Sequence, residues 1–96
     1  MFSKMKELME MKKQADRIKK ELDGSWVEVD AIRGVKIVVS GSQCFKSLEI
    51  DDALIHAGNK KELESSLLRG VNEAIRKSQE LAAQKMRSAM PGLPGI

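Results

Sequence analysis

The sequence is poor in aromatic side chains and in cysteine. Among its 96 residues are one Trp, two Phe, no Tyr and a single cysteine, Cys44. One cysteine cannot close an intrachain disulfide, so a disulfide framework is excluded and a reducing compartment is expected. With few aromatic anchors, six Met supply part of the apolar volume, which favours an adaptable helical interface over a deep ligand pocket.

Long apolar runs and targeting segments are also missing. No uncharged apolar run approaches the roughly 18 residues that a membrane-spanning helix requires. The first twenty residues are dense in Lys and Glu, a pattern that is not a secretory signal. We therefore expect a cytoplasmic protein with one domain over residues 1–90, small enough that a partner chain shares in its stability.

Residue combinations for catalysis or metal binding are lacking as well. His56 is the only histidine and has no Cys or second His at ligand spacing, so no metal site is expected. Cys44 and His56 match no nucleophile and base motif, and no Gly-rich phosphate loop occurs. Asp51 and Asp52 are better explained as a helix cap than as an acid–base pair. We expect neither an enzyme nor a cofactor.

Positive charge is concentrated at the two ends of the chain. Residues 1–22 and residues 60–96 each carry seven basic and four acidic residues, whereas residues 23–59 carry three and six, for a net charge of +3. A polyanion would be attracted to the ends and repelled by the centre.

Hydrophobic periodicity predicts a helix, a small sheet and a second helix. A first helix from Ser3 to Leu22 has a stripe with coiled-coil spacing, formed by Leu8, Met11, Ala15, Ile18 and Leu22. Alternation between residues 25 and 50 predicts a three-stranded antiparallel meander. Its turns are expected at Arg33-Gly34 and Gly41-Ser42, and its third strand is expected to place on one face Cys44, Lys46, Leu48 and Ile50.

The second half of the chain reads as a short helical turn followed by a long helix. Asn59 is expected to cap that helix in a capping box with Glu62. Its stripe is predicted to contain Leu68, Val71, Ile75, Ser78 and Ala82, with Leu67, Leu81 and Met86 beside it. Residues 91–96, rich in Pro and Gly, are expected to form a flexible tail. The order indicates the α+β class.

Both helices carry candidate DNA-binding residues. On the first helix, one side opposite the apolar stripe carries Lys6, Lys13, Arg17 and Lys20, a row that can follow phosphates. The alternative is a solvated face, partly compensated by Asp16. If the helices lie antiparallel and project beyond the sheet, one distal tip would bring together Lys4, Lys6, Lys85 and Arg87. The helix dipole alone also accounts for cations at a helix C-terminus.

Other side chains have structural interpretations that compete with functional ones. The apolar stripes are expected to form core or dimer interface, not a ligand groove. Trp26 is expected to pack, with base stacking as the alternative.

Several strings of the sequence resemble the YbaB/EbfC family of nucleoid-associated DNA-binding proteins. They are GVKIVVSG at 34–41, SLEID at 47–51, the stretch ELESSLLRGVNEAIRKSQELAAQKM at 62–86 and a Leu-Pro-Gly tail. The most specific pieces are Ile50-Asp51 and the step from Val71 to Ala74, followed by Lys77 and Glu80. Where the family usually has a glycine-rich first hairpin, this chain has only Gly34.

The resemblance implies a homodimer whose sheets meet at the centre while paired helices project around double-stranded DNA. It implies a nucleoid location, a role in nucleoid organisation and gene expression, and no catalysis. Family DNA binding is ascribed to basic residues on the projecting helices, which correspond here to Lys4, Lys6, Lys12, Lys13, Lys85 and Arg87. With mostly phosphate contacts, sequence preference is expected to be weak. The alternative is a protein-interaction adaptor, for example to a DNA repair or replication protein.

Overall fold

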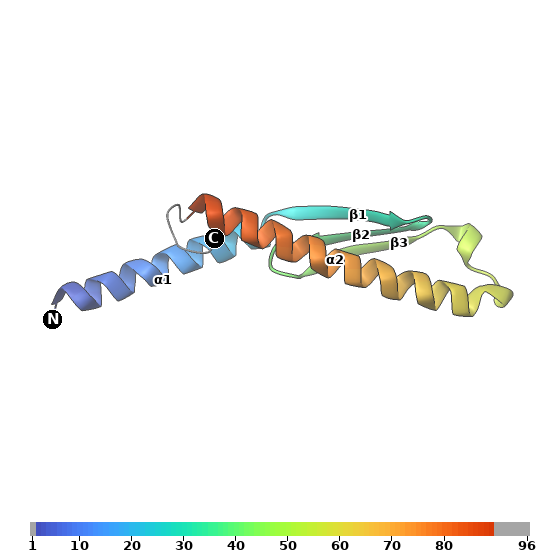
Figure 1. Ribbon diagram of the computed structural model, residues 1–96, viewed down its shortest axis with the longest axis horizontal. Coiled ribbons are helices and arrows are strands. Elements are labelled where there is room, and N and C mark those ends of the chain that lie inside the picture. Colours follow the sequence, from blue (N-terminus) through green and yellow to red (C-terminus); the bar gives the residue numbers. More distant parts are fainter. Residues whose placement is uncertain (1, 90–96) are drawn as a thin grey trace.

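The chain folds into an elongated two-layer structure that measures 67 × 22 × 17 Å along its principal axes. The computed structural model describes residues 2–89, so the predicted tail at 91–96 lies outside the described residues. In chain order the elements are α1 (Phe2–Asp23), β1 (Trp26–Ile32), β2 (Val35–Ser40), β3 (Phe45–Ile50), the 3-10 turns η1 (Asp52–Leu54) and η2 (Ala57–Asn59), and α2 (Lys60–Ala89) (Figure 1). The predicted α+β class and element order are confirmed.

The end of α1 is fixed beside the sheet by hydrogen bonds to its last carbonyl oxygens. After Gly24 interrupts the helix, the Ser25 hydroxyl donates to the carbonyl oxygen of Glu21 at 2.7 Å. The N–H of Gly41, in the turn between β2 and β3, donates to the carbonyl oxygen of Leu22 at 3.1 Å. These bonds satisfy carbonyls that a helix end leaves open, and they set the direction in which α1 leaves the sheet.

The sheet is an antiparallel meander in the order β1-β2-β3, with β2 in the centre. Its first turn lies at Arg33-Gly34 as predicted, and Gly34 adopts a φ of +87°, a conformation that glycine tolerates without strain. The prediction that Cys44 belongs to the third strand is wrong. Its N–H donates to the hydroxyl oxygen of Ser40 at 3.0 Å, which holds Cys44 in the turn before β3.

Helix α2 lies against one face of the sheet, over β1 and β2. Its buried line consists of three small residues at intervals of four, Gly70, Ala74 and Ser78. A Cβ atom on Gly70 would lie 3.1 Å from the Cδ1 atom of Ile37. The Ser78 hydroxyl donates to the carbonyl oxygen of Ser40 at 2.7 Å. Small side chains therefore let the helix backbone approach the sheet closely.

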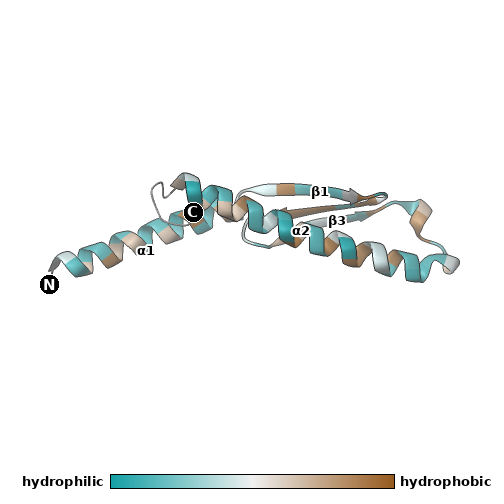
Figure 2. Cartoon of the chain, in the orientation of Figure 1, coloured by the Kyte–Doolittle hydropathy of each residue, from teal (hydrophilic) through white to brown (hydrophobic). Residues whose placement is uncertain are grey.

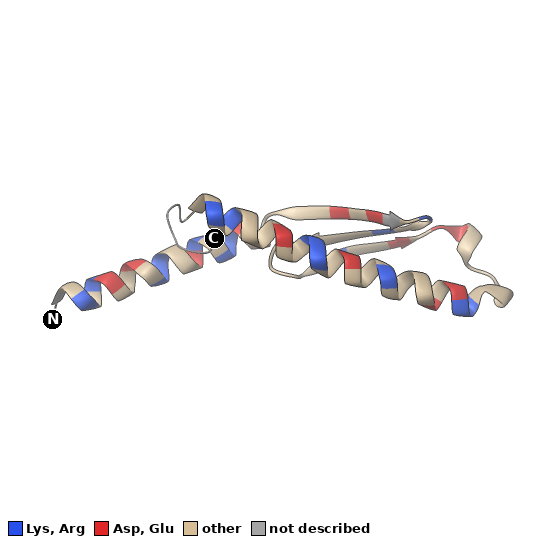
Figure 3. Cartoon of the chain, in the orientation of Figure 1, with Lys and Arg blue, Asp and Glu red and all other residues tan. Residues whose placement is uncertain are grey.

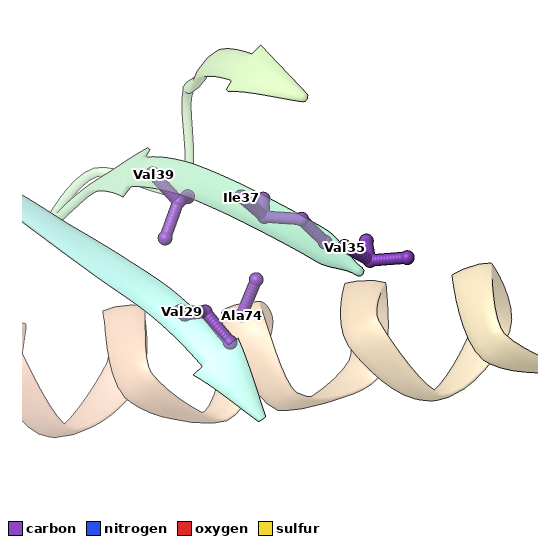
Figure 4. Packing of buried hydrophobic residues seen from close by; sticks show 5 residues of the cluster. All are labelled: Val29, Val35, Ile37, Val39 and Ala74. Carbon is purple, nitrogen blue, oxygen red and sulfur yellow. The ribbon is translucent and has the colours of Figure 1, made fainter. Parts of the chain in front are cut away.

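The core forms between this line and the alternating apolar residues of the strands. Figure 4 shows Val29 of β1 and three residues of β2 gathered around Ala74 of α2; the complete cluster is Val29, Val35, Ile37, Val39 and Ala74. Leu67 and Val71 pack partly buried at its edge. Leu68 was predicted to belong to the packed stripe, but its side chain is exposed. The contact line runs through the small residues instead, which turns Leu68 away from the core.

The segment before α2 has the predicted aspartate cap but not the predicted capping box. Asp51 accepts a hydrogen bond from the N–H of Ala53 at 3.3 Å and caps η1. Asn59 is buried, and its side-chain amide donates to the carbonyl oxygen of Leu54 at 2.7 Å. That is the one hydrogen bond of the Asn59 side chain within residues 2–89, so the predicted capping box with Glu62 is wrong. The Asn59 amide thus links the turn that ends at Leu54 to the start of α2.

The β3 half of the inner sheet face is not covered by α2. A groove of about 360 Å³ remains there, lined by Ile37, Phe45, Lys46, Ser47, Leu48 and Val71. Phe45 is 46% exposed and Leu48 is 51% exposed. We call this feature the β3 groove.

The opposite sheet face is polar. Lys36 lies 3.5 Å from a carboxylate oxygen of Glu28 on β1 and 4.0 Å from one of Glu49 on β3. Trp26 was expected to pack, and it remains 42% exposed with the Lys46 ammonium 5.1 Å from its ring centroid. This cation–π contact partly covers the ring.

Helix α1 projects beyond the sheet and meets α2 only near its own last turns (Figure 1). Ile18, in the apolar stripe of α1, is buried and only 8% exposed. Leu8 and Met11 are each 64% exposed, and Figure 2 shows apolar positions on the part of α1 that has no neighbour. The expectation that the stripe packs is confirmed for Ile18, whereas Leu8 and Met11 are uncovered in the single chain.

The close approach of α2 can be tested by enlarging Ala74. Ala74→Leu should lower the free energy of unfolding by about 1–3 kcal/mol, because the packed layer has no room for a longer side chain. Urea unfolding at one fixed protein concentration measures the loss. Ala83→Leu, on the exposed side of α2, is the control and should change stability by less than about 0.5 kcal/mol. Equal stability of the two variants would contradict this packing.

Candidate nucleic-acid interface

One side of α1 presents a row of cations, with Glu10 between Lys6 and Lys13. At 100° per residue the same side carries Lys6, Lys13, Arg17 and Lys20, which we call the α1 basic row. All four side chains are exposed. With a rise of 1.5 Å per residue, the row extends over about 21 Å of helix axis. Figure 3 shows that basic positions recur along the whole of α1.

The cations of α1 have no acidic partners within the described part of the chain. No ion pair involves a Lys or Arg of α1, although Asp16 was expected to compensate Lys20. A shallow hollow of about 350 Å³ lies on this side, lined by Lys13, Asp16, Arg17 and Lys20. The positive potential of the row is therefore only partly reduced by its neighbours.

Several cations outside α1 are, by contrast, neutralised by carboxylates. Lys36 lies between two glutamates, and Lys60 lies 3.9 Å from Glu64. On α2, Arg76 donates to both Glu73 and Glu80. The hydrogen bond from Arg76 lowers the pKa of Glu73 from its ordinary value, and the same bond raises the pKa of Arg76. Such groups are poorly placed to exchange partners with a phosphate.

The predicted four-residue basic tip does not form within the chain. The Lys85 ammonium lies 3.6 Å from a carboxylate oxygen of Glu21, close to the sheet-proximal end of α1. Lys4 is seventeen positions before Glu21, a separation of about 25 Å along the helix. The prediction is wrong because α2 stays on the sheet and ends beside the last turns of α1, while the first turns of α1 continue alone.

The predicted DNA-binding residues therefore fall into two separate groups. Residues on the free part of α1 are Lys4, Lys6, Lys12 and Lys13, all exposed. Arg17 and Lys20 continue the row toward the sheet, where α2 adds Lys85, half-buried in its ion pair, and Arg87, exposed in the last turn. Sequence reasoning missed the Glu21–Lys85 pair, since nothing in the local pattern relates residues so far apart.

The described residues form neither a metal-binding cluster nor a membrane-spanning helix. Within residues 2–89, no three His, Cys, Asp or Glu side chains lie together in a way that could hold a metal ion. Neither α1 nor α2, as described, is long and apolar enough to cross a membrane.

Comparison with known proteins assigns the chain to a family. The model of the YbaB/EbfC DNA-binding family matches residues 1–93. The chain belongs to the YbaB/EbfC family. Proteins named nucleoid-associated protein are similar to it: one from Dictyoglomus thermophilum is 31% identical over 97% of this chain and 90% of its own length. A relative from Syntrophobacter fumaroxidans is 33% identical over 99% of this chain and 89% of its own length. One from Ruminiclostridium cellulolyticum is 30% identical over 96% of this chain and 81% of its own length.

Membership in the YbaB/EbfC family confirms the resemblance found in the sequence. The matched region includes α1, the sheet and α2, so every predicted site residue falls within it.

The position of Lys85 can be checked by cross-linking. In a Cys44→Ser background, a short bifunctional maleimide should link Glu21→Cys to Lys85→Cys within one chain, because their side chains are neighbours. Lys6→Cys with Lys85→Cys should give no intrachain link. Denaturing electrophoresis and peptide mass analysis distinguish links within a chain from links between chains. An intrachain link between positions 6 and 85 would restore the shared tip and contradict the observed helix arrangement.

Proposed function

We propose that this YbaB/EbfC protein is a nucleoid-associated protein that binds double-stranded DNA through the α1 basic row. The observation that carries the proposal is a row of exposed cations without ion-pair partners among residues 2–89, on a helix that projects from the fold. The family's description as DNA-binding and the names of the relatives support it. In this role the protein acts in the cytoplasm, at the nucleoid, and contributes to nucleoid organisation and regulation of gene expression without a catalytic step.

The chemistry of the row favours contact with the DNA backbone. Each phosphate that a Lys or Arg neutralises releases a counterion and contributes about −0.9 to the slope of log affinity against log salt. Arg17 adds a planar guanidinium that can bind a phosphate through two N–H groups. Phosphate contacts position a protein but carry no base information, so affinity should differ little between sequences.

The other predicted residues contribute differently. Lys4 and Lys12 are exposed on the free part of α1 but lie on other sides of the helix than the row, so they add positive charge near it without extending it. To contact DNA, Lys85 must first break its ion pair with Glu21, because a phosphate and the Glu21 carboxylate compete for the Lys85 ammonium. Arg87, exposed at the end of α2, can add a contact near the sheet. We therefore assign the main contribution to the row and a smaller one to α2.

We further propose that two copies associate through the β3 groove. Apolar Phe45 and Leu48 are about half exposed beside Val71, and α2 leaves this half of the sheet face open. A chain of this size buries a limited fraction of its surface alone. In a dimer with two-fold symmetry, both subunits use the same surface patch, so the groove of one copy would face the groove of the other. The resulting homodimer would carry two α1 basic rows.

Removing charge from the row tests the DNA contact. Lys13→Gln with Arg17→Gln should weaken binding to all duplexes about equally and reduce the magnitude of the salt slope by about 2. Fluorescence anisotropy with a labelled duplex across a salt series measures both quantities. Lys36→Gln with Arg76→Gln removes the same charge from residues that already have carboxylate partners and is the matched control.

Two results would contradict this proposal. The control double variant could weaken binding as much as the double variant in the α1 basic row. The loss would then be an effect of net charge and not of the position of the row. Wild-type affinity could also be absent at about 50 mM salt or unchanged as salt rises, which is incompatible with counterion release. The second result would favour the protein-interaction adaptor.

The proposed dimer can be tested with a charge in the β3 groove. Leu48→Lys should convert a dimer to monomers, because burying the ammonium without a partner is unfavourable. Val38→Lys, which lies opposite Glu28 in the register between β1 and β2, adds the same charge on the other sheet face and should leave the dimer intact. Sedimentation velocity gives the masses. A dimer that persists with Leu48→Lys would exclude the groove as the interface.

A further inference from the structure

Met9 is a large apolar side chain on the basic side of α1, and it is 62% exposed. It follows Lys6 by three positions and precedes Lys13 by four, and side chains at these spacings are neighbours on a helix surface. At 100° per residue, Met9 lies about 60° around the helix from Lys6 and about 40° from Lys13. A flexible thioether thus stands between two cations of the α1 basic row.

The position of Met9 is not one that packs α1 on the rest of the fold. Ile18, which is buried, marks the side of α1 that contacts the remainder of the chain. Nine residues separate Met9 from Ile18, which places them about 180° apart around the helix. Met9 therefore points outward with the lysines of the row, toward whatever the row binds.

The free part of α1 has dimensions that match the major groove of DNA. An α-helix with its side chains is about 10–12 Å in diameter, and the major groove of B-DNA is about 12 Å wide and admits such a helix. Lys6 and Lys13 are about 10.5 Å apart along the helix axis. In a helix seated obliquely in the groove, their long side chains can reach phosphates of the two strands. A shorter side chain between them then faces the edges of the bases.

Two residues lie between these lysines on this side of α1, Met9 and Glu10. The carboxylate of Glu10 would be repelled by the phosphates of both strands, whereas Met9 carries no charge. The next cation of the row indicates the same rotation, since Lys20 lies about 20° from Met9 and about 80° from Glu10 around the helix. The rotation of α1 that brings the row onto DNA thus turns Met9 inward and Glu10 toward solvent.

From these observations we infer that Met9 contacts thymine C5-methyl groups in the major groove of the DNA that the α1 basic row binds. This contact rests on the proposed function, because the lysines must first bring α1 to the duplex. Thymine is the base that presents a methyl group in that groove, and a flexible, polarizable thioether adapts well to an apolar surface. The resulting preference is small, about fourfold for one buried methyl group, and adds to phosphate contacts that are equal for all sequences.

Replacing thymidine by deoxyuridine tests the contact, because it removes the methyl groups and leaves every phosphate in place. Fluorescence anisotropy at one fixed salt concentration compares two labelled duplexes that differ only in this replacement. The wild-type protein should bind the thymidine duplex about fourfold more tightly. Met9→Gln should lower that ratio of affinities to near one. Met11→Gln is the matched control and should keep the wild-type ratio, because Met11 is 64% exposed but lies about 160° from Met9.

Three results would overturn this contact. They are a wild-type ratio near one, the same ratio in Met9→Gln as in the wild type, and an equal loss of the ratio in Met11→Gln. A salt series separates this contact from the proposed function, since Met9→Gln changes no charge and should leave the salt slope as in the wild type. A normal slope without a methyl preference would reject the Met9 contact alone. An affinity that does not change with salt would instead reject the phosphate binding on which the contact rests.

Discussion

The close approach of α2 to the sheet is the contact on which the rest of the structure depends. Gly70, Ala74 and Ser78 form a line of small residues, and the Ser78 hydroxyl bonds the carbonyl oxygen of Ser40 at 2.7 Å. Small side chains bring the helix backbone near β1 and β2, where the core residues are close-packed. This line fixes both the rotation of α2 about its axis and its path across the sheet.

Two consequences for function arise from that path. Because α2 lies over β1 and β2, the β3 half of the sheet face stays open and its groove is available to another chain. Because α2 ends beside Glu21, the first turns of α1 extend without a neighbour. The free part of α1 has two opposite sides, one basic and one apolar.

Much of this architecture was predictable from the sequence because local patterns specify it. The alternation around Val35, Ile37 and Val39 predicted a central strand, and Gly34 marked the hairpin turn. The α1 basic row followed from helical periodicity alone. Family membership confirmed the resemblance carried by the strings between residues 34 and 86.

What the sequence did not predict depends on contacts between distant residues. Periodicity gives weight to large apolar side chains, so Leu68 was placed in the packed stripe, whereas the helix approaches through smaller residues. The pairing of Lys85 with Glu21 depends on where α2 ends relative to α1. The Asn59 side chain donates to the carbonyl oxygen of Leu54 and does not form the capping box at the start of α2. This hydrogen bond depends on the fold of the preceding turn.

The central claim is that the α1 basic row contacts DNA, and lysine footprinting tests it most directly. Acylation rates of individual lysines, measured by mass spectrometry with and without a duplex, report which ammonium groups DNA covers. The account predicts that Lys6, Lys13 and Lys20 lose reactivity when the duplex is bound, while Lys36 and Lys60 keep theirs. Protection of Lys36 and Lys60 with unchanged reactivity along the row would contradict it.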